Sequence, residues 1–234
     1  MPEAKSGEAA SIGYLFTDID GYTEKWERTP REMAAAQARH DAIIDEVIVR
    51  HGGVIHDRAG DGVFATFPGG DVLECALQLQ LALQNCDWEE VDGLAVRIGV
   101  HCATPSDNGL SDKGNVIRAS RIMSSAWGGQ IVVSSAAVGA SKLPDNCELS
   151  DLGLCRLKGI EQPMRLFGLL HPSLAQQEFP PLRFLSHVTQ AILSASTPIY
   201  GREDELAFLI SKFSGETRQV LIAGPGGNGK TRLA

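Results

Sequence analysis

YLFTDIDGYT, residues 14–23, is an apolar run that ends in an acidic loop, and HGGVIHDRAGDGVFATF, residues 51–67, reads as two short β segments around a tight turn. The β-rich residues Ile12–Ile19 predict a strand that ends at the first of these motifs. Asp18 therefore follows a strand, and Asp61 lies at the turn of a hairpin. Both aspartates are expected at strand or turn ends, where side chains reach solvent or a cleft.

Alternating helical and β patterns surround these motifs. A helix is predicted over residues 31–51, where apolar residues recur near helical spacing until Gly52 and Gly53 stop it. The other predicted elements are strands at 54–58 and 62–67, a helix at 71–86, a strand at 94–101, a loop at 102–114, a helix at 115–127, a strand at 130–133, a short helix after Ser135, and β segments over 148–170. The order β-α-β-β-α-β is that of an α+β, ferredoxin-like core with extra C-terminal strands.

Composition excludes several classes of protein. The net charge of −8 over 234 residues argues against a general nucleic-acid or anionic-membrane binder. No apolar run is long enough to cross a bilayer, and the polar start of the sequence lacks the features of a secretory signal. The five cysteines form no CxxC pair, so they are interpreted as reduced thiols of a cytoplasmic protein.

The sequence divides into four parts. Residues 1–11 are expected to be a flexible N-terminus, and residues 12–170 one domain. Residues 171–198 contain four prolines around a short apolar segment, which is typical of an interdomain linker. Residues 199–234 are expected to begin a second domain.

The two aspartates suggest a metal site. If Asp18 and Asp61 converge, their carboxylates repel unless a divalent cation lies between them. Hard oxygen ligands of this kind suit Mg²⁺ or Mn²⁺ with a nucleoside triphosphate. For either motif alone, the simpler interpretation is an acidic residue that solvates or caps a turn.

The motifs occur in a set. YLFTDIDGYT, the hairpin, VRIGVH at 96–101 and ASRIMSSAWGGQIVVS at 119–134 resemble, in order and spacing, the catalytic domain of class III adenylate and guanylate cyclases. LGLCRLKGIEQPMRLFGL at 152–169 resembles the closing strands of the same domain. The resemblance covers residues 12–170 and implies the class III cyclase fold.

The resemblance also implies a chemistry. Asp18, Asp61 and the backbone of Ile19 match the family's ligands for two Mg²⁺ or Mn²⁺ ions, and Arg121 matches its transition-state arginine. The loop residues Gly21, Tyr22 and Thr23 would hold phosphate through their backbone amides. A nucleoside triphosphate, most plausibly ATP, would be attacked at its α-phosphorus by its own 3′-hydroxyl, with pyrophosphate leaving.

Family sites form between two cyclase domains. One domain in this chain implies a head-to-tail homodimer with two sites. Asp18 and Asp61 would then come from one protomer and Arg121 from its partner.

Several positions depart from the family pattern. Asp57 stands where the family selects the base with a lysine, and strand alternation predicts that His56 and Arg58 point to the opposite face. Ile117 stands at the family's asparagine, which Asn115 could replace only if the helix starts differently. The family's second base-selecting position falls on Leu110 or on Ser111. Two polar residues, Asn108 and Asp112, lie nearby in the sequence. These changes predict weak or altered activity.

A phosphate-binding motif lies near the end of the sequence. Residues 224–231 fit GxxxxGK[ST], with Gly224, Gly229, Lys230 and Thr231 at its defining positions, after the apolar run QVLIA. With YGREDEL at 200–206, this motif resembles the opening of signal-transduction ATPases found behind cyclase domains in bacterial regulators. Because the sequence ends at Ala234, we expect this P-loop to be truncated and without ATPase activity.

Three hypotheses follow. The chain is a working cyclase, a silent cyclase homology domain that binds nucleotide or dimerises to regulate a downstream ATPase, or an ATP-binding switch centred on Lys230. The retained Asp18, Asp61 and Arg121 favour the first hypothesis over the second, and the truncation disfavours the third.

Overall fold

A computed structural model describes residues 11–69, 72–104 and 110–183, and five positions between 202 and 211. Its elements, in chain order, are β1 (Ile12–Ile19), α1 (Tyr22–Arg28), α2 (Pro30–Arg50), β2 (Val54–Ala59), β3 (Gly62–Pro68), α3 (Val72–Gln84), a 3₁₀ turn (Glu89–Val91), β4 (Val96–Ala103), α4 (Leu110–Ser125), β5 (Ile131–Ser134), α5 (Ser135–Ala140), β6 (Glu148–Cys155) and β7 (Met164–Leu170). The seven strands form one sheet in the order β2-β3-β1-β4-β5-β7-β6. The first four have the strand order of a ferredoxin-like fold, which confirms the predicted topology.

β1 lies in the middle of this core and pairs antiparallel with both β3 and β4. Its residues alternate between two faces, as strand geometry requires. Leu15 and Ile19 are buried in the main core with residues of α2 and α3. Phe16 and Asp18 occupy the alternate positions, so the strand carries Asp18 on the face away from that core.

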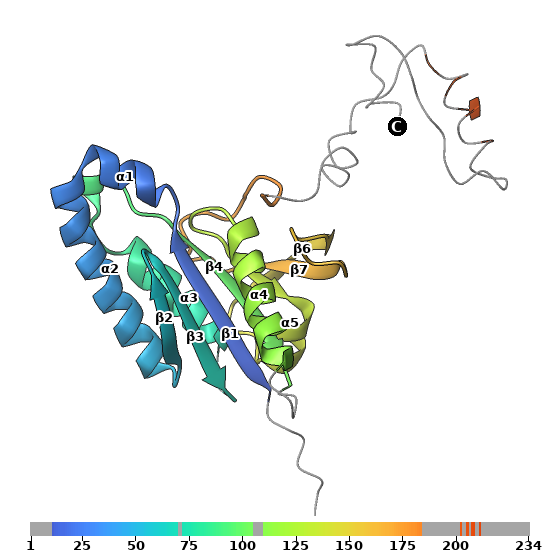
Figure 1. Cartoon of the computed structure of the whole chain (residues 1–234), viewed down its shortest axis with the longest axis horizontal. Coiled ribbons are helices and arrows are strands. Elements are labelled where there is room, and N and C mark those ends of the chain that lie inside the picture. Colours follow the sequence, from blue (N-terminus) through green and yellow to red (C-terminus); the bar gives the residue numbers. More distant parts are fainter. Residues whose placement is uncertain are drawn as a thin grey trace, which may run out of the picture. The chain divides into compact units, whose positions relative to one another are not determined.

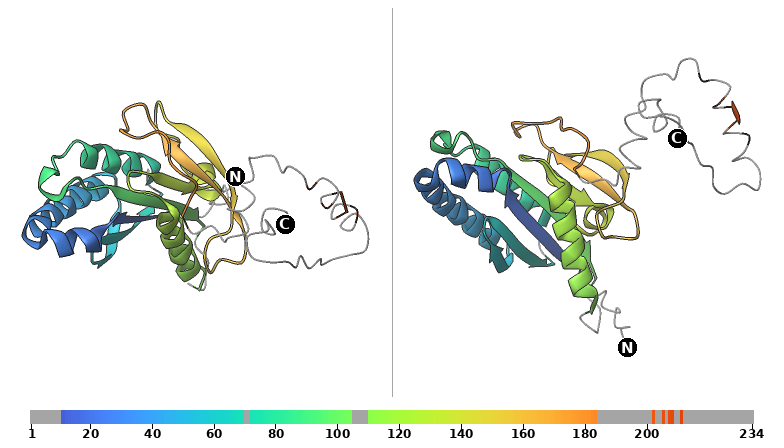
Figure 2. Two further views of the ribbon diagram at one scale, coloured as in Figure 1. Left: turned by 90° about the horizontal axis from the view of Figure 1, so that it is seen from above. Right: turned by 45° about the horizontal axis from the view of Figure 1, so that its top comes forward.

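Two glycines let helices approach the sheet closely, one on each face. A Cβ on Gly13 would lie 2.9 Å from Cβ of Val72 in α3, and a Cβ on Gly99 would lie 2.2 Å from the backbone nitrogen of Met123 in α4. Figure 2 shows α3 and α4 on opposite sides of the sheet. Glycine is therefore required by packing at both positions.

The face that carries α4 is only partly covered. α4 packs on β1 and β4, and no described helix lies over β2 and β3 on that side (Figure 1). Aromatic rings line this open face: Phe16 stacks on Phe64 with centroids 4.7 Å apart, and His56 stacks on Phe64 at 5.3 Å. We call the surface formed by these three side chains the open face.

Two predicted boundaries differ from the structure. Residues 22–28 form the short helix α1, which buries no residue and so gives no apolar stripe in the sequence. α4 begins at Leu110, within the segment predicted as a loop, because Gly114 is tolerated inside the helix.

The prediction that His56 points away from the face of Asp57 is wrong. A register shift between Ile55 and Asp57 makes His56 the bulged residue of β2. Its ring therefore reaches Phe64 on the open face, where its Nε2 lies 2.7 Å from Oγ1 of Thr66. Arg58, in contrast, pairs with Asp41 and Asp45 of α2.

Residues 171–183, the start of the expected linker, contact the domain. Leu174 and Leu182 are buried, and the side chain of Gln84 bonds the backbone of Ser173 and Ala175. All five cysteines are free thiols. No helix among the described residues is long and apolar enough to span a bilayer. The P-loop residues 224–231 and the first ten residues lie outside the described residues.

Candidate active site

Asp18 and Asp61 lie close together in the structure. Asp18 is the last but one residue of β1, and Asp61 lies at the β2–β3 turn. The backbone amide of Ile19 donates a hydrogen bond of 2.9 Å to Oδ2 of Asp61, which fixes that carboxylate beside β1. Asp61 is only 9% exposed. Two carboxylates from different strands therefore meet at one end of the sheet.

The environment of Asp61 disfavours its charge. Burial first, and then the negative charge of Asp18, raise the pKa of Asp61 to about 6. The hydrogen bond from the Ile19 amide and the charge of Arg97 oppose this shift. A raised carboxyl pKa beside a second carboxylate is typical of a functional site.

Arg97 balances the pair and was missed by sequence reasoning. This residue of β4 is the register partner of Asp18, and its Nε donates a 2.8 Å hydrogen bond to Oδ2 of Asp18. The pair is about four-fifths buried. The signal in the sequence that could have identified Arg97 is that it is the only charged residue within the apolar strand VRIGV.

The donor set fits a divalent cation. Asp18 and Asp61 offer hard carboxylate oxygens, and the Asp18 carboxylate already binds a cation, the guanidinium of Arg97. Burial and the charge of Asp18 raise the pKa of Asp61, and a bound cation would favour its ionised form. We therefore assign Asp18 and Asp61 as the residues that could hold Mg²⁺ or Mn²⁺, with the Ile19 backbone as a third predicted ligand.

The predicted phosphate loop is the start of a helix. Gly21 is the N-cap of α1 in the left-handed conformation, with φ of 74°, and Tyr22 and Thr23 begin the first turn. Amides of a first turn have no partner within the helix and can bind anions. The Asp20 amide is already used, because it donates to the Ala95 carbonyl at 2.8 Å.

Tyr22 anchors this turn to the hairpin of Asp61. Its hydroxyl donates to Oε1 of Gln37 at 2.9 Å, and Nε2 of Gln37 donates to the Gly60 carbonyl at 3.1 Å. The phosphate-loop candidate and the Asp61 turn are thus linked through α2.

Arg121 lines a cavity of about 240 Å³ together with two further cations, Arg97 and Lys158. Ser124, Ser125 and Leu157 complete its wall. Three cationic side chains around one space favour an anionic ligand such as a phosphate group. Lys158 lies in the RLKG segment and was not singled out from the sequence.

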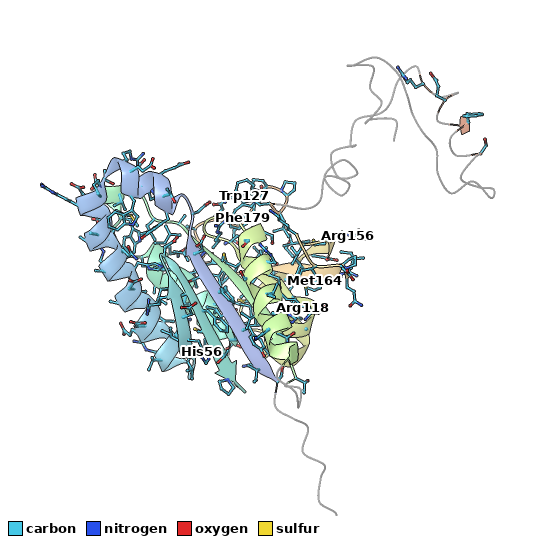
Figure 3. The ribbon with its side chains drawn as sticks, in the orientation of Figure 1. His56, Arg118, Trp127, Arg156, Met164 and Phe179 are labelled. Carbon is cyan, nitrogen blue, oxygen red and sulfur yellow. The ribbon has the colours of Figure 1, made fainter. Side chains whose placement is uncertain are left out.

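Asp57 stands at the position where the base is expected to be contacted. Asp57 is exposed and is the register partner of Phe64, while its Oδ1 accepts a 2.9 Å hydrogen bond from the Arg58 amide. His56 lies beside it on the open face (Figure 3). Nothing is described of the side chains of residues 110–112, and Asn108 lies outside the described residues.

Ile117 and Asn115 of α4 differ in their exposure to solvent. Ile117 is half exposed, whereas Asn115 is buried and its Oδ1 accepts a 3.1 Å hydrogen bond from Nη1 of Arg118. Asn115 also hydrogen-bonds His101 of β4. Within the protomer, Asn115 is therefore committed to internal contacts.

Comparison with known proteins identifies the family. The family model described as the adenylate and guanylate cyclase catalytic domain matches residues 4–171. The chain belongs to this family. An uncharacterized protein of Mycobacterium tuberculosis is 31% identical over 204 residues, which cover 84% of this chain and 69% of that protein. An adenylate cyclase of Schizosaccharomyces pombe is 27% identical over 278 residues, covering 95% of this chain and 16% of that protein.

Solved structures share the cyclase fold. Adenylate cyclases from Trypanosoma brucei in their monomeric state match with a TM-score of 0.65 at 22% identity, over 77% of this chain and 97% of theirs. The adenylyl cyclase CyaB from P. aeruginosa matches with a TM-score of 0.58 at 19% identity, over 75% of this chain and 97% of its own. The class III cyclase domain is thereby shown, and with it the nucleotide cyclase class of enzyme.

Proposed function

We propose that this chain converts a nucleoside triphosphate to a 3′,5′-cyclic nucleotide and pyrophosphate, with weak or altered activity, in signal transduction. The convergence of Asp18 and Asp61 carries this proposal. Burial first, and then the charge of Asp18, raise the pKa of Asp61, an arrangement that disfavours its charge and that a purely structural domain would have no reason to keep.

Asp18, Asp61 and the Ile19 carbonyl would hold two Mg²⁺ or Mn²⁺ ions. Bound there, the ions would neutralise the triphosphate and make the ribose 3′-hydroxyl more acidic. The protein itself keeps the two carboxylates together through the Ile19 amide and limits their exposure to water.

Phosphate binding would use the cations and amides near these aspartates. Arg97 lies on Asp18 and also lines the cavity of Arg121 and Lys158, so a cation on Asp18 would leave its guanidinium available to phosphate oxygens. Arg121, contributed by the partner protomer, would stabilise the negative charge that develops on the reacting phosphoryl group. The first turn of α1 adds amides from Tyr22 and Thr23.

ATP is the most plausible substrate. The carboxylate of Asp57 can accept a hydrogen bond from the exocyclic amine of adenine, and it would repel the O6 carbonyl of guanine. His56, the residue before it, adds an imidazole on the open face whose Nε2 lies 2.7 Å from Oγ1 of Thr66. Cytosine also carries an exocyclic amine and remains the alternative base.

A homodimer would complete each site. The open face presents the half-buried rings of Phe16 and Phe64, and the neighbouring α4 exposes half of Ile117, an apolar surface that suits a second copy. Asp18 and Asp61 of one protomer would then meet Arg121 of its partner.

The alternative is a catalytically silent cyclase homology domain that binds nucleotide or dimerises to regulate a downstream ATPase. Two observations favour it. The exposed Ile117 cannot hydrogen-bond a ribose, and Asn115 is engaged inside the protomer. Loss of one such donor costs about 100- to 1,000-fold in turnover.

A product assay separates the two functions. The protein is incubated with ATP, GTP, CTP or UTP and Mn²⁺, with Asp18→Ala as the inactive control. Asp151→Ala serves as a matched control, because it removes an exposed carboxylate that pairs with Arg165 on the β6–β7 hairpin. A cyclic product that only Asp18→Ala abolishes supports the cyclase. No product from any triphosphate leaves the silent domain.

A substitution pair tests the reason for weak activity. Asp57→Lys with Ile117→Asn should raise turnover if those two positions alone limit the enzyme. Val49→Asn, on an exposed apolar position of α2, is the control for a general effect of surface polarity.

A further inference from the structure

Residues 171–183 form a strap that returns to the domain beyond the part matched by the family model, which ends at residue 171. Leu174 and Leu182 are 6% and 3% exposed. Nε2 of Gln84 donates to the Ser173 carbonyl at 2.6 Å, and the Ala175 amide donates to Oε1 of Gln84 at 2.9 Å. The strap is therefore packed and hydrogen-bonded against the cyclase domain.

Arg183, the last residue described in this strap, is held in four ways. Its Nη1 and Nη2 donate to Oδ1 and Oδ2 of Asp20, each at 2.7 Å. Its guanidinium lies 3.9 Å from the centroid of a Trp127 ring, and its amide donates to the Ser125 carbonyl at 2.8 Å. Nε1 of Trp127 in turn donates to the Pro181 carbonyl at 3.0 Å. A bidentate, stacked and three-quarters buried pair of this kind is stronger than an ordinary surface ion pair.

Asp20 lies within the site loop, which we define as residues 18–23. It separates the metal-ligand candidate Asp18 from Gly21, the N-cap of α1. Its amide bonds the Ala95 carbonyl, and its Oδ2 accepts a 3.2 Å hydrogen bond from the Gly128 amide. A Cβ on Gly128 would come within 3.0 Å of Cβ of Asp20, so the two backbones are in close contact. Asp20 is therefore the fixed point of the loop.

The contact between Arg183 and Asp20 also changes the charge beside the site. Without a partner, the Asp20 carboxylate would add negative charge beside a site that must accept a triphosphate. Arg183 neutralises that carboxylate and also fixes its direction. No other described cation hydrogen-bonds Asp20.

We propose that Arg183 is a positioning residue for triphosphate binding: by holding and neutralising Asp20, it sets the place of the site loop. This inference rests on the proposed cyclase function. It makes the strap, which lies outside the family's matched region, a part of the nucleotide site.

The first test compares variants of the whole chain in the cyclase assay. Arg183→Gln should raise KM for the triphosphate by about tenfold and change kcat less, because binding rather than chemistry is affected. Arg183→Lys should recover part of the affinity, and Asp20→Asn combined with Arg183→Gln should lower KM again by removing the unpaired charge. Arg165→Gln, which breaks a comparable bidentate pair with Asp151, should leave KM unchanged. An unchanged KM in Arg183→Gln, or a double variant no better than the single one, would overturn the proposal.

The second test does not need turnover. Hydrogen exchange of the nucleotide-free protein should show faster exchange in residues 19–23 of Arg183→Gln than of the wild type, while β5 stays protected. Equal exchange in both proteins would sink the positioning role even if the wild type is an active cyclase. Faster exchange with no product from the wild type would keep the positioning role and remove the proposed activity.

Discussion

At the scale of single residues, Asp61 combines burial, a neighbouring carboxylate and backbone hydrogen bonds that include the one from the Ile19 amide. Its ionised form is disfavoured in the folded protein, so the residue is suited to binding a cation and unsuited to stabilising the empty fold. The same carboxylate therefore has opposite effects on ligand binding and on stability.

Asp61→Asn should stabilise the metal-free protein at neutral pH. The pKa of Asp61 is about 6 in the fold and 3.8 for an unperturbed aspartate, so the folded state binds more protons between these values. The free energy of unfolding therefore falls as pH rises through this window, and asparagine removes that loss while keeping an acceptor for the Ile19 amide. Urea unfolding with a chelator at pH 4 and 7.5 should show an advantage of the variant only at the higher pH.

Asp151→Asn provides the control for that experiment. Hydrogen bonding with Arg165 lowers the pKa of Asp151, so its replacement should give no gain at pH 7.5. A wild-type protein that is more stable than Asp61→Asn at pH 7.5 would contradict the account of Asp61.

His101 should contribute to stability with the opposite pH dependence. Burial, and then the charge of Arg118, lower the pKa of His101 to about 4 from 6.5. The unfolded state therefore binds more protons between pH 4 and 6.5, and the contribution of neutral His101, which bonds Ser134 at 2.9 Å, is lost as pH falls through that window. Asp61 changes the free energy of unfolding with pH in the opposite direction. The contribution of His101 is therefore measured as the difference in the free energy of unfolding between wild type and His101→Gln. That difference should shrink from pH 7 to pH 4, and a constant difference would refute the assignment.

At the scale of elements, the sequence predicted the strands better than the helix ends. β1, β3 and β4 have apolar residues at alternating positions, and all three were found. α1 was missed because a seven-residue helix with no buried residue has no apolar period. The bulge at His56 was missed because nothing in the residues around it distinguishes a bulge from regular pairing.

The composition of residues 171–183 gave a second misleading signal. Prolines there indicated a linker, yet two leucines and Arg183 pack this segment on the domain. Its contacts involve residues far away in the sequence, such as Gln84 and Asp20, which local composition cannot reveal.

The start of α1 offers a test at this scale. Gly21 has φ of 74° and nothing lies within 4 Å of a Cβ built on it, so Gly21→Ala would add backbone strain without a clash. We expect a loss of about 1 kcal/mol in the free energy of unfolding, together with weaker triphosphate binding. Gly139→Ala in α5 is the control, since Gly139 has the same free space but no positive φ, and this variant should not be destabilised. Equal stability of the two variants would contradict the strained N-cap.

At the scale of the whole molecule, the cyclase site is divided between features that one protomer brings together and features that it does not. Asp18, Asp61 and Arg97 meet within the protomer, and the sequence motifs predicted the two aspartates. Arg121 lines a cavity together with Lys158 and Arg97, and within the described residues it makes no hydrogen bond to either aspartate. Among the described residues no helix covers β2 and β3 beside α4, as Figure 1 shows, which is the arrangement expected if a second copy completes the site.

Complementation between two inactive variants tests this central claim most directly. Asp18→Ala and Arg121→Ala proteins are each assayed for cyclic product, then mixed in equal amounts, allowed to exchange subunits and assayed again with Mn²⁺. If the aspartates of one protomer work with the arginine of its partner, half of the dimers are mixed and each has one intact site of two, so activity should return to about a quarter of the wild-type value. A mixture as inactive as its two components, beside an active wild type, would contradict a cyclase site shared between protomers.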